Sequence, residues 1–361
     1  MSPCSEQLLA ALIADVALAP DELARREAFA HGFASLRANL DLHPRSSRAS
    51  RTFEAAAETA STVAAGCLPL GLALVMHLYP LCALRCVPLP WWSAARTRRT
   101  RLLRDIDARG LLLANAGSER RAGAHAPVAL RHTTWGVLVN GTYDYVSLAN
   151  VADLVMFSAP LAGCDETMFC VASLRSESVR IGAAKFGGSM RLSDTCAVAF
   201  DGHLVPSGRH LAVPSDAARD CIAQYQRNWF QLLLVEVYLA RVARLRDAWN
   251  LAASAADAAI LEELALMKAY ALRLLDEATG PAAIADLSRV TSAMKLRASG
   301  LSQDVAMDVR IHDPAAAREL GFLRLQPTSD DRIVRGLLAA RGNASRRRPF
   351  EIQQRQLVLD A

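Results

Sequence analysis

The stretch Leu138–Ala159, LVNGTYDYVSLANVADLVMFSA, decides the fold class of this chain. Alternating apolar residues precede Asn140-Gly141, and a second apolar run, Leu154–Ser158, closes the stretch. Asn-Gly between two such runs is a strong signal for a hairpin. The sequence therefore predicts a turn at Asn140-Gly141 with strands on both sides of it.

The β pattern extends over residues 113–212, which are rich in Val, Thr, Phe and turn residues. A second turn signal, Asp201-Gly202, lies near the end of this region. We expect an antiparallel β-barrel or sandwich here. The alternation predicts strands at Val128–Arg131, Gly136–Val139, Leu154–Ser158, Met168–Ser173 and Cys196–Phe200.

Helical spacing of apolar residues dominates both flanks of the β region. Pro20-Asp21-Glu22-Leu23 is typical of a helix start, and Gly110 is typical of a residue that ends a helix. After Pro214, long Ala-, Leu-, Glu- and Arg-rich runs predict helices that pack as a four-helix bundle. We therefore expect an α+β protein with three domains: an N-terminal helical domain (1–112), a middle β domain (113–212) and a C-terminal helical bundle (213–361).

Residues 59–84 carry no Asp, Glu, Lys or Arg, and a segment of this length could span a bilayer. Pro69 and Pro80 interrupt the segment, and polar residues such as His77 dilute it. Because proline breaks helices, we predict two buried helices broken near the prolines, and no membrane span.

The composition is that of a globular protein. Apolar residues make up 52% and charged residues 21% of the 361 residues, which argues against disorder. The eight cysteines show no CxxC or Cys/His ligand spacing, so we expect no metal site. No secretory signal is recognisable, so we expect reduced thiols in the cytoplasm. The GxGxxG, GxxxxGKS/T, GxSxG and HExxH motifs are absent from the sequence, which argues against the sites they form.

The chain has a net charge of +5, and its basic residues gather in two clusters, Arg96–Arg101 and Arg346–Arg348. Either cluster could meet the phosphates of a nucleotide, of CoA or of a carrier-protein prosthetic group. A solvated helix face is the commoner explanation for the first cluster. No aromatic interleaving or nucleic-acid motif accompanies them, so we expect no nucleic-acid partner.

Three segments, in this order along the chain, resemble motifs of the acyl-CoA dehydrogenase superfamily. Ser118–Ala124 resembles the family's Thr-Glu-Pro-Gly-Ala-Gly-Ser segment, with Arg120 and Arg121 in place of its Pro and first Gly. Asn140–Ser147 resembles the segment that lies along the flavin ring in that family. Gly188–Pro206 is similar to the family's Gly-Met-Arg-x-Ser/Thr segment and the strand that follows it.

This resemblance implies the fold of that family and a flavin cofactor, either FAD or FMN. Ser118 would donate its hydroxyl to the pyrimidine edge of the flavin, and Gly123 matches the second glycine of its segment. Tyr145 would lie beside the isoalloxazine ring, Val146 belongs to the same contact segment, and Ser147 would reach the N5 edge.

The catalytic base of the family, a Glu in the C-terminal bundle, is where this sequence departs from the pattern. Alignment with the family places Arg347 at one base position and Phe230 at the alternative one. Neither side chain can abstract a proton from an acyl thioester. Glu236 and Glu351 are the nearest carboxylates in sequence, and a surface or salt-bridge role is the commoner one for both. The catalytic base is therefore unassigned.

Three functional hypotheses follow. The first, which we favour on sequence, is an FAD-dependent dehydrogenase acting on acyl-CoA or an acyl carrier protein, with an undefined electron acceptor. The second is a monooxygenase of the same fold, which uses reduced flavin and O₂, depends on a flavin reductase and needs no Glu base. The third is a non-redox binding protein, because Ala252–Asp257 replaces the family's Arg-x-x-Phe-Gly contact to the flavin diphosphate. The resemblance also implies a homodimer or homotetramer.

Overall fold

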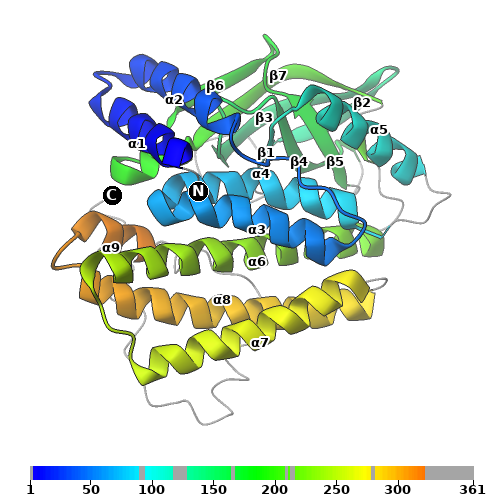
Figure 1. The fold of residues 1–361 in the computed structure, drawn as a ribbon. Coiled ribbons are helices and arrows are strands. Elements are labelled where there is room, and N and C mark those ends of the chain that lie inside the picture. The colour runs from blue at the N-terminus through cyan, green and yellow to red at the C-terminus, as the bar shows by residue number, and fades with distance from the viewer. Residues whose placement is uncertain are drawn as a thin grey trace.

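Helices pack below and beside a β domain, as the computed structural model of the chain shows (Figure 1). The structure describes residues 3–88, 94–116, 128–163, 167–207, 210–211, 216–277 and 281–321. Helices come first and last in the order of elements, and strands lie between them. The α+β fold class predicted from the sequence is confirmed.

The N-terminal part is helical up to Arg109. Its helices are α1 (Pro3–Leu18), α2 (Glu22–Arg37), α3 (Ala49–Gly66), α4 (Leu68–Cys86) and α5 (Ala94–Arg109). The predicted helix start is correct, because the Asp21 carboxylate accepts a hydrogen bond of 2.8 Å from the Ala24 amide and caps α2. Gly110 follows α5 with a φ of 59°, the left-handed backbone that glycine adopts without strain at a helix end.

The apolar segment 59–84 forms two buried helices, as predicted, but only one break separates them. Cys67 lies between α3 and α4, just before Pro69. Pro80 lies inside α4, so the break predicted there is wrong; packing along nearly the whole of α4 holds that helix together despite the missing amide. Of the described helices, α4 has the length and composition to cross a membrane, but 83% of its apolar stretch is buried inside the fold.

The described strands of the β domain form two four-stranded sheets. The first sheet has the order β1-β4-β5-β8 and the second the order β2-β3-β7-β6. All pairs are antiparallel except β1 with β4, which is parallel and departs from the purely antiparallel expectation. The strands are β1 (Leu113–Asn115), β2 (Ala129–Thr133), β3 (Gly136–Val146), β4 (Leu154–Pro160), β5 (Thr167–Ser173), β6 (Val179–Ala184), β7 (Cys196–Pro206) and β8 (His210–Leu211).

The two predicted turns, Asn140-Gly141 and Asp201-Gly202, are not turns. They lie opposite each other inside β3 and β7, where the pairing steps from Val139–His203 to Gly141–Phe200. Two residues of β7 face one residue of β3 at this step, which is a β-bulge. Gly141 and Gly202 have φ values of 117° and 61°, and the Gly202 amide donates to Asn140 Oδ1 at 2.8 Å. The glycines therefore supply the positive φ that a bulge shares with a hairpin turn.

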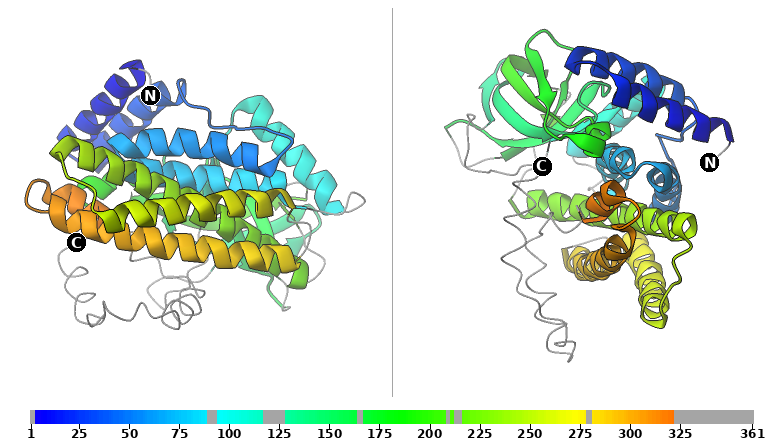
Figure 2. Two further views of the ribbon diagram at one scale, coloured as in Figure 1. Left: turned by 60° about the horizontal axis from the view of Figure 1, so that its bottom comes forward. Right: turned by 90° about the vertical axis from the view of Figure 1, so that its left-hand side faces the viewer.

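The described C-terminal part consists of three long helices and one short one. These are α6 (Asp216–Trp249), α7 (Ala255–Glu277), α8 (Pro281–Val309) and α9 (Pro314–Gly321). Helix α6 packs against α3 and α4 on one side and α8 on the other, and α7 packs on α8. The end-on view in Figure 2 shows the resulting layers, with the β domain on the far side of α3 and α4 from the bundle. A fourth long helix, expected after residue 321, would lie outside the described residues.

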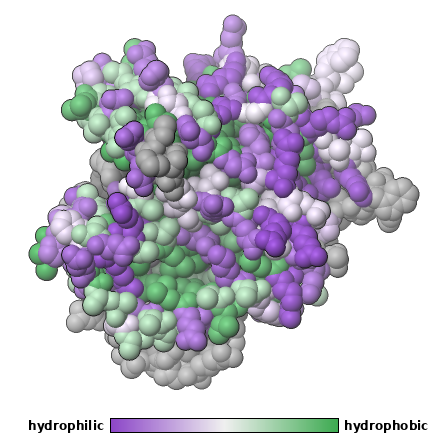
Figure 3. Space-filling model, viewed as in Figure 1, coloured by the Kyte–Doolittle hydropathy of each residue, from purple (hydrophilic) through white to green (hydrophobic). Residues whose placement is uncertain are grey.

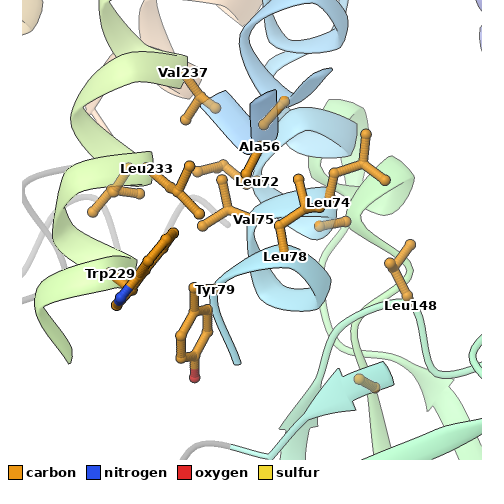
Figure 4. Packing of buried hydrophobic residues seen from close by; sticks show 14 of the residues in the cluster. Ala56, Leu72, Leu74, Val75, Leu78, Tyr79, Leu148, Trp229, Leu233 and Val237 are labelled. Atoms are coloured by element: carbon orange, nitrogen blue, oxygen red, sulfur yellow. The ribbon is translucent and has the colours of Figure 1, made fainter. Parts of the chain in front are cut away.

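Helix α4 is the centre of the hydrophobic core. Its buried face contacts α3 and α6, and other residues of α4 contact β1 and the 3₁₀ helix η1 (Gly188–Ser193). Trp229 and Leu233 of α6 approach Val75 of α4, while Leu148 of the β domain lies on the opposite side of that helix (Figure 4). One helix therefore joins the bundle to the β domain, and the candidate site lies at this junction.

Candidate functional site

The predicted flavin-contact segment, Tyr145-Val146-Ser147, begins at the last residues of β3. Val146 is fully buried, pairs with Cys196 of β7 and forms an antiparallel bridge to Ala116 just after β1. The bridge ties the two sheets together at this point. Alternation then exposes Tyr145 and leaves Ser147 half-buried, so a phenol ring and a hydroxyl face outward from a fixed backbone.

Tyr145 forms one side of an exposed aromatic surface. Its side chain is 43% exposed, and the ring of Phe186 stacks on it with centroids 5.9 Å apart and an interplanar angle of 28°. The ammonium of Lys185 lies 5.9 Å from the centre of the Tyr145 ring and pairs with Asp144 at 3.1 Å. A planar aromatic ligand could stack on such a surface.

Ser147 is the outer end of a chain of three hydroxyl groups. Its Oγ lies 2.9 Å from Thr195 Oγ1, which lies 2.8 Å from Ser193 Oγ. Thr195 and Ser193 are buried, whereas Ser147 is half-buried. Each hydroxyl has one proton to donate. If Ser193 donates to Thr195 and Thr195 to Ser147, the Ser147 proton is directed outward to an acceptor on a ligand.

Two left-handed residues hold this chain of hydroxyls in place. Leu148 has a φ of 57° and Asp194 a φ of 47°, a backbone conformation that is uncommon outside glycine, although asparagine and aspartate adopt it more often than other residues. The turn after Ser147 and the turn at Asp194 face each other, with the Leu148 amide donating to the Ser193 carbonyl and the Ala149 amide to the Asp194 carbonyl, both at 3.2 Å. Backbone strain of this kind is often found at functional sites.

Asp194 connects these turns to the N-terminal helices. Its carboxylate accepts from the Asn150 amide at 2.8 Å and from Asn150 Nδ2 at 2.6 Å. The guanidinium of Arg25 on α2, also completely buried, lies 3.4 Å away and forms a second ion pair with Glu22 at 2.8 Å. Burial raises the pKa of Asp194, while the donors from Asn150 and Arg25 favour its charged form. Hydrogen bonds to Arg25 hold the pKa of Glu22 near 2.

A buried polar pair that the sequence analysis missed lies next to this segment. Asn115, at the end of β1, donates from Nδ2 to the Tyr79 hydroxyl of α4. Both residues are at most 9% exposed, and burial raises the pKa of Tyr79, which keeps the phenol neutral. Asn115 precedes the residue that bridges to Val146. A single polar residue inside the apolar run 111–116 was the available signal.

Phe230, at one of the predicted base positions, packs against Tyr79 of this pair. Its ring meets the ring of Tyr79 edge-on, with centroids 5.2 Å apart. One turn earlier on α6, Gln226 Nε2 approaches the sulfur of Met156 on β4 at 3.8 Å. The part of α6 that faces Tyr79 and β4 therefore presents an aromatic ring and an amide, and no carboxylate among these contacts.

The candidate carboxylate Glu236 is directed elsewhere. Its Oε2 binds the ammonium of Lys268 on α7 at 2.8 Å, so it joins two bundle helices. This bears out the salt-bridge role considered for Glu236 from sequence. Ser118, Gly123, Arg347 and Glu351 lie outside the described residues. In the described part of the chain, no group of three His, Cys, Asp or Glu side chains is arranged to hold a metal ion.

The sequence matches no protein-family model and no curated protein. Several solved structures match over nearly the whole chain. KijD3, in complex with FMN and a dTDP-linked amino-keto sugar, has a TM-score of 0.66 and 18% identity over 96% of this chain and 95% of that one. FMN-bound TdsC, a dibenzothiophene monooxygenase from Paenibacillus sp. A11-2, has a TM-score of 0.63 and 18% identity over 94% and 96%. PigA with FAD and proline has a TM-score of 0.64 and 16% identity over 94% and 99%.

Proposed function

Because the chain has the acyl-CoA dehydrogenase-like fold, we propose that it is a flavin-dependent oxidoreductase that binds FMN or FAD at the surface formed by Tyr145 and Ser147. The observation that carries the proposal is the half-buried hydroxyl of Ser147, which is hydrogen-bonded in a chain with two buried hydroxyls and lies two residues after Tyr145 of the Tyr145–Phe186 ring pair. Flavins are bound in the similar structures described above, which supports the same cofactor class here.

The residues present fit a flavin ring. The Tyr145–Phe186 surface offers a stacking partner for a planar aromatic ring, and Ser147 offers a donor for a ring nitrogen. A bound flavin supplies the redox chemistry, either as an acceptor of hydride or, when reduced, as a source of electrons for O₂. The chain's own residues would bind and orient the ring, and the buried Tyr79–Asn115 pair would keep the adjoining interior polar.

The geometry favours a reaction with reduced flavin and O₂, the second of the hypotheses drawn from the sequence. Dehydrogenation of an acyl thioester needs a positioned carboxylate to take the α-proton. Phe230, which the sequence alignment places at one base position, packs on Tyr79, and Glu236 is held by Lys268. A monooxygenase needs no such carboxylate. We therefore propose that the protein depends on a separate flavin reductase or another source of reduced flavin.

Dehydrogenation of an acyl-CoA or acyl carrier protein thioester is the second candidate. The arginines of α5 favour it, because Arg98, Arg101 and Arg104 form no ion pair within the described part of the chain and would suit phosphate groups. A dehydrogenase would need a catalytic base from the residues outside the described part of the chain, which include Glu351.

Flavin-loaded protein separates the two candidates. Under anaerobic conditions, oxidised flavin that is bleached by added acyl-CoA thioesters would support dehydrogenation and contradict the O₂ proposal. With photochemically reduced FMN and air, the proposed monooxygenase should bind the reduced flavin and change its rate of reoxidation relative to free FMN. An identical rate with and without protein would contradict that proposal.

A further inference from the structure

Two turns, residues 147–150 and 193–195, are more than 40 residues apart in sequence and are joined by hydrogen bonds next to Ser147. Five hydrogen bonds join them: Ser147 with Thr195, Leu148 with the Ser193 carbonyl, Ala149 with the Asp194 carbonyl, and Asn150 twice with the Asp194 carboxylate. Both turns contain a left-handed residue that is not glycine. Leu148 is also fully buried in the core beside α4 (Figure 4), so its turn is anchored on two sides.

The Asp194 carboxylate is the point at which these contacts meet the rest of the molecule. It binds Asn150, which belongs to the turn after Ser147, and Arg25, which belongs to α2. Arg25 is completely buried and also binds Glu22, whose Oε1 accepts from the Ala184 amide of β6 at 3.2 Å. Arg26 of the same helix donates to the Gly182 carbonyl at 2.6 Å. Helix α2 is therefore fixed to the β domain around Asp194.

We propose that Asp194 is a positioning residue that sets the direction of the Ser147 hydroxyl toward the flavin, and that Arg25 of α2 holds Asp194 for this task; the inference rests on the proposed function. The carboxylate holds Asn150, the backbone of the same turn holds Ser193 and Asp194, and Thr195 follows directly as the hydrogen-bond partner of Ser147.

A purely structural ion pair would not require this arrangement. An ion pair between α2 and the β domain could be made by a carboxylate on regular backbone, without a left-handed residue. Here the left-handed Asp194 separates Ser193 from Thr195, and the hydroxyls of these two neighbours bond to each other and then to Ser147. The unusual backbone at position 194 is thus what aligns the chain of hydroxyls.

The variant Asp194→Asn tests the proposal, because asparagine tolerates the left-handed backbone but brings donors where Arg25 and Asn150 already donate. We expect the dissociation constant for FMN to rise about tenfold, in keeping with the loss of hydrogen bonds to a charged group. The absorption bands of the bound flavin should shift toward those of free flavin. In the flavin-free protein, hydrogen exchange of the amides at 148–150 should become faster.

Asp201→Asn is the matched control. Asp201 lies on β7, is exposed, and pairs with Arg180 at 3.0 Å on the surface. This variant should leave the flavin dissociation constant, the flavin spectrum and the exchange of residues 148–150 as in the wild type. The comparison separates the loss of the buried carboxylate at the turn from the loss of an exposed carboxylate on the strand that follows it.

Asn150→Ala is the milder second variant in case Asp194→Asn does not fold. It removes the side-chain donor of Asn150 to Asp194 but leaves Arg25 and the Asn150 backbone amide in place. The flavin dissociation constant, the flavin spectrum and the exchange of residues 148–150 should change in the same direction by a smaller factor. Wild-type flavin binding together with unchanged spectra and exchange in Asp194→Asn or Asn150→Ala would overturn the role of Asp194 and leave the proposed function standing. A wild type that takes up neither FMN nor FAD would overturn both.

Discussion

Ser147 is the residue whose side chain has the most specific proposed contact with a ligand. It is half-buried, its partner Thr195 is buried, and its proton can be directed outward by the hydroxyls behind it. Ser147→Ala should therefore weaken flavin binding by about 1 kcal/mol, or roughly fivefold in the dissociation constant. Ser147→Thr should restore most of the loss. Fluorescence titration with FMN and FAD measures both.

Ser178→Ala is the control for that experiment. The Ser178 hydroxyl bonds His203 Nδ1 at 2.8 Å in the same domain, away from the aromatic surface of Tyr145. Flavin affinity should be the same in this variant as in the wild type. If Ser147→Ala binds flavin as tightly as Ser178→Ala, the hydroxyl of Ser147 makes no contact with the cofactor.

His77 is a buried residue whose protonation affects stability. The Leu113 amide donates to its Nδ1 at 2.9 Å, and its Nε2 lies 2.9 Å from the Leu42 carbonyl, so the neutral ring with its proton assigned to Nε2 satisfies both. Burial lowers its pKa from 6.5 to about 4. The unfolded chain therefore binds this proton more readily than the folded one, and the free energy of unfolding should fall as the pH drops from 6.5 to 4, by up to about 1.4 kcal/mol per pH unit.

Urea unfolding at a series of pH values tests this prediction. His77→Gln should be less stable at pH 7 but should lose less further stability between pH 6.5 and 4 than the wild type. His132→Gln, at an exposed position on β2, should keep the wild-type slope. A wild-type stability that does not change over this range would contradict the neutral, buried imidazole.

At the scale of elements, the tight connection between α3 and α4 depends on a glycine. A Cβ atom added at Gly71 would lie 2.4 Å from the Cβ of Ala64 and 2.7 Å from its Cα. Gly71→Ala should therefore push the two helices apart and destabilise the protein by about 1–3 kcal/mol. In Gly300→Ala on α8, the new methyl group meets nothing within 4 Å, so that variant should be more stable by about 0.5–1 kcal/mol.

Denaturant unfolding of both variants measures the difference. Because alanine favours helix equally in both, the opposite signs isolate the effect of helix contact from that of helix propensity. Equal stabilisation of Gly71→Ala and Gly300→Ala would show that α3 and α4 are further apart than described.

The sequence predicts an element correctly where residues close together in the chain determine its structure by themselves. Asp21 was recognisable as a helix cap because it acts on a residue three positions away. Asn140-Gly141 was misread because a positive φ serves a bulge as well as a turn, and only the pairing with β7 decides between them. Pro80 was misread because burial against α3 and α6 outweighs one lost hydrogen bond.

The site could be predicted only in part, for a similar reason. Tyr145 and Ser147 are candidates because their segment resembles a motif of the acyl-CoA dehydrogenase superfamily over a few residues. Asp194 and Arg25 are 169 positions apart, and nothing in their own neighbourhoods indicates that both are buried against each other. Tyr79 and Asn115 likewise meet only when α4 packs on β1.

On the scale of the whole molecule, the surface differs between its two halves. Figure 3 shows hydrophobic surface over the lower helices, while hydrophilic surface dominates the upper half. Leu266 and Tyr270, one turn apart on α7, are 69% and 43% exposed. We propose that the surface of α7 around Leu266 and Tyr270 joins two or four copies of the chain, as the resemblance to an oligomeric family implied, because exposed apolar patches mark interaction surfaces.

Light scattering coupled to gel filtration tests that proposal. The wild type should have the mass of a dimer or tetramer, and the double variant Leu266→Asp/Tyr270→Asp should have a lower mass. The control variant Glu262→Asp, at an exposed position on the same helix, should have the same mass as the wild type. A monomeric wild type would contradict the proposal.

We propose above all that the junction of the β domain and the helices binds a flavin. The most direct test is the absorption spectrum of the purified protein after incubation with FMN or FAD and removal of the free cofactor. We predict that flavin bands remain with the protein in near-equimolar amount and weaken in Ser147→Ala and Asp194→Asn. A colourless wild-type protein after incubation with either flavin would contradict the claim.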